Sequence, residues 1–335
     1  MIPFDVKNTI LVTGAAGFIG FHLSRLLLSE GAAVVGIDNM NDYYDVRLKE
    51  SRLEVLNGYE RFTFVRGSIS NEELVNYVFS DHHPDIVVNL AAQAGVRYSI
   101  DNPRSYVDSN LVGFFNILEA CRDSYNMDSG VKHLVYASSS SVYGNQEKTP
   151  FSVSDPVDHP ISLYAATKKS NELMGYAYSH LYGIPMTGVR FFTVYGPYGR
   201  PDMAYFKFAD KMRRGEPIQI YNNGDLLRDF TYVDDIVAGL ERMLCNPPED
   251  DGQAQHALYN IGNNSPVRVL DFIDVLEEEL GMKAVREYLP MQPGDVYQTY
   301  ADVDDLERDF GYRPSTTLKQ GLHEFAKWYR DYYQI

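Results

Sequence analysis

Short apolar runs alternate with amphipathic stretches through the first half of the chain. The continuous apolar, β-branched runs are residues 9–13, 33–37, 62–65, 85–90, 131–137 and 186–192. The stretches with helical periodicity between them are residues 18–29, 72–79, 107–121 and 163–182. Apolar runs without polar alternation are typical of parallel strands that helices cover on both faces. The pattern therefore predicts an α/β fold with a doubly wound parallel sheet of the Rossmann type.

The pattern changes after residue 193, where proline, glycine and tyrosine become frequent. The helices predicted here are 205–214, 230–244, 269–280 and 318–329, and the strands are 218–221 and 257–261. The last strand is expected to return to the main sheet. We therefore expect two units along the chain. They are a dinucleotide-binding domain of residues 1–192 with 230–262, and a smaller C-terminal substrate-binding lobe of residues 193–229 and 263–335.

Composition narrows the choice of partners. The 335 residues carry 30 Lys and Arg against 46 Asp and Glu, a net charge of −16. Neither nucleic acid nor an anionic membrane is an expected partner, and an anionic substrate would need a local cluster of cations. Cys121 and Cys245 lie outside any disulfide or zinc spacing, no apolar run is long enough to span a bilayer, and no signal-peptide pattern opens the sequence. We expect a cytoplasmic protein without a metal site.

Three glycines stand between the first predicted strand and the first predicted helix. Gly14, Gly17 and Gly20 have the spacing G-x-x-G-x-x-G. Glycines at such a junction allow a tight turn and a close approach of a pyrophosphate, and the helix N-terminus supplies N–H donors to its oxygens. A glycine-rich turn of purely structural importance is the alternative. The strand–turn–helix context favours a dinucleotide site.

An acidic residue at the end of the second strand points to the kind of dinucleotide. Asp38 follows Gly14 by 24 residues. A carboxylate here accepts hydrogen bonds from ribose hydroxyls and repels a 2′-phosphate, which favours NAD over NADP. Lys49 and Arg52 lie downstream and could soften this preference. Small residues after the fourth strand, at 89–93, would let a cofactor pass close to the backbone.

A tyrosine and a lysine share one face of the helix predicted at 163–182. Tyr164 and Lys168 are four residues apart, and four serines, 138–141, follow the strand predicted at 131–137. An unperturbed tyrosine has a pKa of about 10, too high for a base at neutral pH. We expect a neighbouring ammonium and a nicotinamide cation to lower that pKa, and a serine hydroxyl to bind the reacting oxygen.

Together these motifs resemble those of the extended short-chain dehydrogenase/reductases over nearly the whole chain. The motifs are the glycine turn, 38–39, 89–92, 138–144, 164–168 and 228–235. Within that family the chain is most similar to the UDP-glucuronate 4-epimerases, on residues 94–99, 190–204 and 291–295. The resemblance implies a redox-neutral, NAD-dependent 4-epimerisation of UDP-glucuronate through a 4-keto intermediate, in a homodimer formed through the helices at 107–121 and 163–182.

The resemblance also implies the site residues. Tyr164 would be the catalytic base, Lys168 its partner, and Ser139 the hydroxyl on the sugar 4-oxygen. The implied cofactor contacts are Gly14, Ala16, Gly17, Phe18, Ile19, Gly20, Asp38, Asn39, Ser68, Ile69, Leu90, Ala91, Ala92, Gln93, Asn110, Ala137, Tyr164 and Lys168. The implied substrate contacts are Arg97, Ser139, Ser140, Ser141, Thr193, Arg200, Lys207, Arg228 and Asp295.

The chain departs from related enzymes at positions that bear on the substrate. Thr193 stands where UDP-glucose 4-epimerases have asparagine, and Ser140 and Ser141 replace the Asp-Glu of dTDP-glucose dehydratases, so no acid is present to drive loss of water. Ser68 stands where many relatives have aspartate. A pocket of hydroxyls with a nearby arginine suits a sugar carboxylate. A 4-epimerase of a neutral UDP-hexose or UDP-N-acetylhexosamine, a UDP-glucuronate decarboxylase and an inert nucleotide-binding module remain as alternatives.

Overall fold

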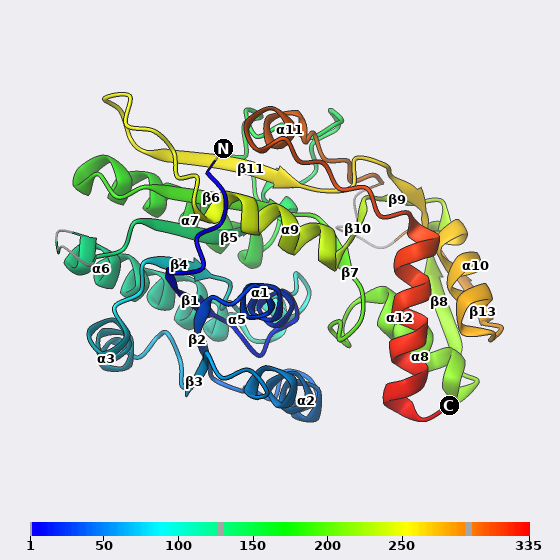
Figure 1. Ribbon diagram of the computed structural model, residues 1–335. Helices are drawn as coiled ribbons and strands as arrows, with labels where there is room; N and C mark the ends of the chain where they lie inside the picture. The colour runs from blue at the N-terminus through cyan, green and yellow to red at the C-terminus, as the bar shows by residue number, and fades with distance from the viewer. Residues whose placement is uncertain (1, 126, 128–129, 292–296) are drawn as a thin grey trace.

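A single parallel sheet organises the first half of the protein (Figure 1). The computed structural model describes residues 2–125, 127, 130–291 and 297–335. Over these residues seven strands pair in the order β11-β6-β5-β4-β1-β2-β3, all parallel. Their bounds are Thr9–Thr13 for β1, Ala33–Asp38 for β2, Phe62–Arg66 for β3, Ile86–Asn89 for β4, His133–Ser139 for β5, Met186–Phe191 for β6 and His256–Ile261 for β11. The predicted doubly wound fold is confirmed, including the return of the late strand to the sheet.

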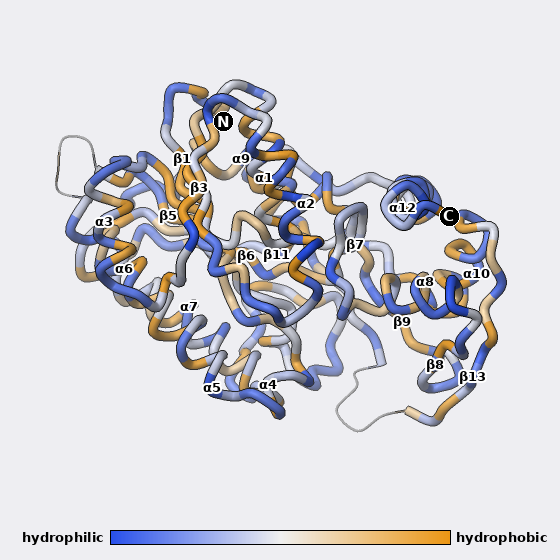
Figure 2. Tube along the Cα trace, turned by 90° about the horizontal axis from the view of Figure 1, so that it is seen from below, coloured by the Kyte–Doolittle hydropathy of each residue, from blue (hydrophilic) through white to orange (hydrophobic). Residues whose placement is uncertain are grey.

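Helices cover both faces of this sheet, and each face has its own apolar core. On one face lie α1 (Phe18–Ser29), α2 (Val46–Asn57) and α9 (Val233–Leu244); on the other lie α3 (Glu72–His82), α6 (Gly113–Tyr125) and α7 (Leu163–Tyr182) (Figure 2). Successive residues of β1 show why the apolar runs are continuous. Ile10 and Val12 belong to the core under α1, whereas Leu11 belongs to the core under α6. Each side chain of such a strand is buried, whichever face it points to.

A smaller lobe stands beside the carboxyl ends of the strands (Figure 1). Its main elements are α8 (Ala204–Arg214), β8 (Pro217–Tyr221), α10 (Val269–Leu280), β13 (Val285–Leu289) and α12 (Leu318–Tyr333). β13 pairs in parallel with β8, and α10 packs against α12. Short strands and one further helix connect the lobe to the sheet: β7 (Thr193–Tyr195), β9 (Leu227–Arg228), β10 (Phe230–Tyr232), β12 (Val267–Arg268) and α11 (Asp304–Phe310).

Two predicted helices differ from the structure. The segment predicted as a helix over 230–244 begins with the strand β10, because Phe230–Tyr232 pairs with β7, and the helix starts only at Val233. The helix predicted over 107–121 consists of a π-helical segment at Val107–Val112 followed by α6, and the short helix α5 (Pro103–Tyr106) comes directly before it. The polar, partly exposed helices α2 and α11 and the exposed strand β13 had no recognisable apolar run and were not predicted.

Among the described residues, no helix is both long and apolar enough to cross a bilayer.

Candidate active site

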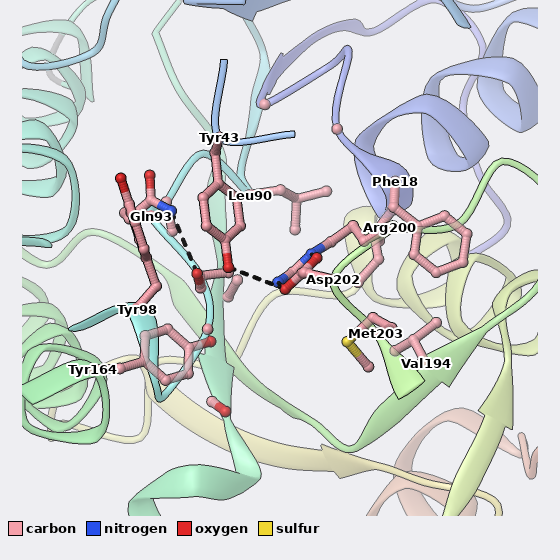
Figure 3. A pocket seen from close by; sticks show the side chains of 18 of the residues that line it. Phe18, Tyr43, Leu90, Gln93, Tyr98, Tyr164, Val194, Arg200, Asp202 and Met203 are labelled. Carbon is pink, nitrogen blue, oxygen red and sulfur yellow. Dashed lines mark hydrogen bonds and ion pairs between the residues drawn. The ribbon is translucent and has the colours of Figure 1, made fainter. Parts of the chain in front are cut away.

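A cavity of about 740 Å³ opens between the carboxyl ends of the strands and the smaller lobe (Figure 3). Most of the predicted site residues line it. They are Gly14, Gly17, Phe18, Ile19, Gly20, Asp38, Asn39, Ser68, Ile69, Leu90, Ala91, Ala92, Gln93, Arg97, Ala137, Ser139, Ser140, Ser141, Tyr164, Lys168, Thr193, Arg200 and Lys207. Residues far apart in the sequence thus meet in one place, where open α/β sheets bind their ligands.

Of the remaining four predicted contacts, the three that the structure describes do not line the cavity wall. Ala16 is buried behind the glycine turn, and Arg228 lies in β9, where it donates hydrogen bonds to Leu227 O and Tyr297 O. Asn110 lies one layer behind the wall, where its amide exchanges hydrogen bonds of 2.8 and 3.0 Å with the backbone of Gln93. It therefore positions a lining residue from outside the cavity. The fourth predicted contact, Asp295, lies outside the described residues.

The glycine turn connects β1 to α1 with no room for side chains. Gly14 has φ +71°, and a Cβ there would lie 2.9 Å from the Ala91 nitrogen. A Cβ on Gly20 would lie 2.1 Å from the Gly14 carbonyl oxygen. Gly17 precedes the first turn of α1, and no side chain caps that end. The first N–H groups of α1 therefore face the cavity, where they can donate to the oxygens of an anion.

Asp38 ends β2 at the rim of the cavity with 7% of its surface exposed. Its carboxylate accepts a 2.8 Å hydrogen bond from the Met40 nitrogen, and the Lys49 ammonium lies 3.6 Å away. Lys49 also donates to the Asn41 side chain at 2.9 Å. These contacts fix the Asp38 carboxylate at the rim of the cavity, where a ribose would lie. Arg52, by contrast, is fully buried and faces away from this rim.

Tyr164 lies at the start of α7 and its ring points into the cavity (Figure 3). Burial raises the pKa of its phenol, whereas a hydrogen bond with Ser139 and the charge of Arg200 lower it. In the chain by itself the pKa is raised, because the loss of solvation outweighs the charges that surround the ring. The predicted lowering includes the charge of a nicotinamide cation and stays a prediction. A further positive charge beside the ring would act in the opposite direction.

Lys168 lies one turn after Tyr164 and is 3% exposed. Its ammonium donates a 2.8 Å hydrogen bond to the Ala137 carbonyl at the end of β5. Burial lowers its pKa to about 8, because a charged ammonium loses solvation here. The amine is thus fixed at the strand end that also carries Ser139.

A buried ion pair supports that strand end and was missed in the sequence. Glu172, one turn beyond Lys168, accepts two hydrogen bonds of 2.8 Å from Arg190 on the neighbouring β6. It also accepts a 2.6 Å hydrogen bond from the Ser138 hydroxyl. Glu172 and Arg190 are each no more than 2% exposed. This pair fixes the orientation of α7 against β5, and so the relation between the tyrosine and the serines.

Ser139, Ser140, Ser141 and Thr193 place four hydroxyl side chains along one side of the cavity. Ser139 accepts a hydrogen bond of 3.1 Å from the Ser141 nitrogen and starts a short 3-10 turn, Ser140–Tyr143. Thr193 is the first residue of β7 and lies on the other side of the β6 end. These hydroxyls can donate to a carboxylate or to a neutral sugar hydroxyl.

Arg200 lines the same cavity but does not act as an isolated cation. It donates from Nε and Nη2 to the two oxygens of Asp202, and Asp202 accepts a 3.2 Å hydrogen bond from Tyr43 (Figure 3). Burial favours the neutral form of Arg200, but the carboxylate beside it raises the pKa overall. Tyr43 and Asp202 were not predicted, because irregular loops carry no periodic signal.

The far end of the cavity is lined by α8 and β8 of the smaller lobe. Lys207 and Lys211 lie one turn apart on α8, and Tyr221 ends β8. The Arg97 guanidinium lies 5.6 Å from the centre of the Tyr221 ring. Two ammonium groups and an aromatic ring form a surface suited to phosphates and a planar base. Lys207 and Arg97 were predicted from the resemblance; Lys211 and Tyr221 were missed.

No cluster of three or more His, Cys, Asp or Glu side chains that could hold a metal ion is found among the described residues.

The parallel sheet, the glycine turn and the tyrosine–lysine pair define an extended short-chain dehydrogenase/reductase. Residues 11–325 match the family model described as GDP-mannose 4,6 dehydratase, and the chain belongs to this family.

Individual relatives and solved structures match nearly the whole length of the chain. The chain is 53% identical over 337 residues to Protein CapI of Staphylococcus aureus, covering 97% of this chain and 99% of that protein. It is 44% identical to a probable UDP-glucuronate 4-epimerase of Rhizobium meliloti, covering 97% of each. Among solved structures, UDP-glucuronic acid 4-epimerase from Bacillus cereus in complex with UDP-glucuronic acid and NAD matches with a TM-score of 0.87 and 34% identity, covering 97% of this chain and 100% of that one.

Proposed function

We propose that this protein is an NAD-dependent 4-epimerase that interconverts UDP-glucuronate and UDP-galacturonate without net redox change. The observation that carries the proposal is one cavity whose wall joins a glycine turn, the Ser139–Tyr164–Lys168 group, further hydroxyl side chains and Arg200. Two of the proteins named above, those of Rhizobium meliloti and Bacillus cereus, are named for the same sugar acid. The glycine turn with the Ser139–Tyr164–Lys168 group would by itself fit many reactions, and so would the other hydroxyls with Arg200. Their presence in one cavity favours this reaction.

The residues present fit NAD. The glycine turn has no room for side chains, so its backbone borders the cavity; no side chain caps the N-terminus of α1 beside it, and Asp38 lies at the cavity rim where a ribose would bind. When bound, NAD supplies the acceptor and donor of hydride that an epimerisation at a secondary alcohol needs.

We assign the proton transfers to the chain's own side chains. Tyr164 takes the proton of the sugar 4-hydroxyl and returns it when the alcohol is re-formed on the opposite face of the ring. Ser139, which hydrogen-bonds the phenol, donates to the sugar 4-oxygen as it gains carbonyl character. Lys168 favours the tyrosinate through its charge. Its lowered pKa of about 8 leaves it mostly protonated at neutral pH.

The hydroxyl groups of Ser140, Ser141 and Thr193 have a second role in this reaction. The 4-keto intermediate of a uronate is a β-keto acid, which loses carbon dioxide most easily when the breaking bond is perpendicular to the carbonyl plane. Ser140, Ser141 and Thr193 can hold the carboxylate away from that angle. Arg200 and Lys207 supply local positive charge against the overall charge of −16.

We further propose the organisation of the protein around this reaction. Residues 1–192 with 230–262 hold NAD, and residues 193–229 with 263–335 hold the nucleotide sugar, with Arg228 and the region of Asp295 on the UDP side.

A cytoplasmic homodimer is proposed, joined through α6 and α7, where Phe115, Leu173 and Tyr176 are 45%, 60% and 51% exposed. Light scattering on the purified protein measures this state, and a monomer at micromolar concentration contradicts it.

The direct test is a panel of UDP-sugars, with products identified by NMR. We expect UDP-glucuronate to give UDP-galacturonate, and UDP-glucose and UDP-N-acetylglucosamine to react much more slowly. If the protein prefers a neutral sugar, it is a hexose epimerase instead. A pentose product would identify a decarboxylase, and a protein inert toward every UDP-sugar would be a binding module.

Thr193→Val tests the acid end of the cavity separately. It keeps the shape of the side chain but removes a donor to the carboxylate. Because a hydrogen bond to a charged group contributes about 1.5–3 kcal/mol, kcat/KM for UDP-glucuronate should fall roughly ten- to a hundred-fold. The affinity for UDP is the internal control and should be unchanged. Equal loss for UDP-glucuronate and UDP-glucose refutes the assignment of Thr193 to the carboxylate.

A further inference from the structure

Side chains of the first unit hold the loop that leads from β7 to Arg200. Three successive carbonyl groups of this loop accept hydrogen bonds from outside it. His22 Nε2, on α1, donates to Pro197 O at 2.9 Å. Arg52 Nη2, on α2, donates to Tyr198 O at 2.7 Å and to Gly199 O at 3.3 Å. The residue next in the chain is Arg200, which lines the sugar end of the cavity.

Arg52 also holds the glycine turn. Its other terminal nitrogen, Nη1, donates to Ala16 O at 2.7 Å and to the Tyr44 hydroxyl at 2.7 Å. One guanidinium therefore connects the turn that receives a dinucleotide with the loop that carries a substrate-side cation. The two terminal nitrogens point to opposite partners, and a lysine, with one nitrogen, could not serve both sides at once.

The burial of Arg52 indicates that this bridge is specific. Arg52 is fully buried, and the acceptors of its hydrogen bonds are backbone carbonyls and a phenol, all neutral. A buried charge is costly unless its donors are satisfied. The guanidinium therefore favours the one arrangement in which the turn, Tyr44 and the loop all stay in reach.

The loop itself is not in a relaxed conformation. Tyr198 has φ +54°, a left-handed value that is unfavourable for a residue with a Cβ. Its ring packs 4.8 Å from Phe21 of α1 and 5.0 Å from Trp328 of α12. Arg52 binds the carbonyl of this same residue. Without that hydrogen bond, the conformation of the loop is less strongly stabilised, and with it the position of Arg200 in the cavity wall.

We propose that Arg52 is a positioning residue that couples the dinucleotide turn to Arg200, so that binding of the cofactor fixes the cation on the sugar side. The assignment deepens the proposed function and rests on it for the identity of the two ligands. Coupling of this kind is reciprocal: a sugar acid that orders Arg200 should also tighten cofactor binding by the same factor.

The first test uses the wild-type protein and binding alone. UDP and UDP-glucuronate are titrated calorimetrically into protein with and without NAD. We expect NAD to raise the affinity for UDP-glucuronate by at least about five-fold, the lower end of typical coupling, and that for UDP by less. Hydrogen exchange at the amides of 198–203, excluding proline, should slow when NAD is added. No change in exchange at these amides, or equal factors for the two ligands, overturns the proposal.

The second test uses Arg52→Lys and a matched control, Arg242→Lys. Arg242 also donates to two loop carbonyls, of Phe310 and Gly311, and lies over a tyrosine ring, but it is remote from the cavity. Arg52→Lys should remove most of the coupling and lower kcat/KM for UDP-glucuronate by about ten-fold, whereas Arg242→Lys should leave both unchanged. If Arg52→Lys does not fold, Arg52→Gln, which leaves no buried charge, replaces it.

A double-mutant cycle separates positioning from general stability. If Arg52 acts through Arg200, Arg52→Lys should cost less than about two-fold in an Arg200→Ala background, because the group it positions is gone. Additive losses overturn the proposal. A wild-type protein that binds UDP-glucose better than UDP-glucuronate would count against the proposed function only, since the exchange of the loop amides on addition of NAD does not depend on the sugar.

Discussion

Replacement of Lys168 by methionine should make the cofactor-free protein more stable and nearly inactive. The lysine is 3% exposed, and burial lowers its pKa from 10.5 to about 8. That shift corresponds to about 3 kcal/mol by which the folded state disfavours the charged amine at neutral pH. Methionine has a similar length and no charge, so it avoids this cost. It also leaves Ala137 O without its 2.8 Å hydrogen bond, which costs about 1–2 kcal/mol.

The balance is a gain of about 1–2 kcal/mol for Lys168→Met at pH 7. Its pH dependence follows from the sign of the shift. Between pH 8 and 10.5 the unfolded chain binds more protons at Lys168 than the folded protein does, so wild-type stability from this group rises with pH through that window. The variant lacks this contribution. Its advantage should therefore be full below pH 8 and reverse by pH 10.5, where only the lost hydrogen bond remains and the variant is about 1–2 kcal/mol less stable than wild type.

Urea denaturation followed by circular dichroism, on protein stripped of cofactor, measures the difference at pH 7 and pH 10. Tyrosines titrate in both proteins, so the comparison isolates the lysine. Lys319→Met, at an ammonium that is 62% exposed, is the matched control and should change stability little at either pH. The turnover of Lys168→Met should fall by at least about a hundred-fold if the lysine assists proton transfer. A variant less stable than wild type at pH 7, or a difference independent of pH, would refute the argument from burial.

Three further predictions concern the remaining parts of the site. Tyr164→Phe should lower kcat by at least about a hundred-fold with an unchanged circular dichroism spectrum, and near-normal turnover would exclude Tyr164 as the base. Cofactor-stripped wild type should bind NAD at least about ten-fold more tightly than NADP, and Asp38→Asn should narrow that gap; equal binding of the two by wild type contradicts the assignment of Asp38. Gly20→Ala should abolish cofactor binding measured by calorimetry, because its Cβ would lie 2.1 Å from the Gly14 oxygen, whereas Gly58→Ala, with 3.2 Å to its nearest neighbour, should bind normally.

The sequence predicted those parts of the fold whose signal is local. The bounds of α1, α7 and α10 match the predicted helices because each has an apolar face of regular period and a clear end. β10 was predicted as helix because only its pairing with β7, nearly 40 positions earlier in the chain, makes these three residues a strand. Pairing between distant segments has no local signal.

The candidate site, too, has residues that the sequence predicted and residues that it did not. Gly14, Asp38 and Tyr164 belong to motifs whose spacing has a mechanical reason, and the structure places all three on the cavity wall. Asp202 and Tyr43 occupy irregular loops, and their relation to Arg200 exists only in three dimensions. The burial that raises the pKa of Tyr164 in the chain by itself was not predicted for a related reason, since nearby charges can be inferred from a motif but the degree of burial cannot.

The path of the chain between the large sheet and the smaller lobe limits how this protein can be divided into fragments. The polypeptide leaves the large sheet after β6, and supplies β7 and the first elements of the smaller lobe before it returns with α9 and β11. β11 pairs along the whole of β6, and α9 packs on α1, the helix that follows the glycine turn. A fragment cut at residue 192 would expose the edge of β6 and the apolar side of α1, which invites aggregation. A free-standing nucleotide module would instead require an internal splice that joins β6 to residue 233 and ends after residue 261.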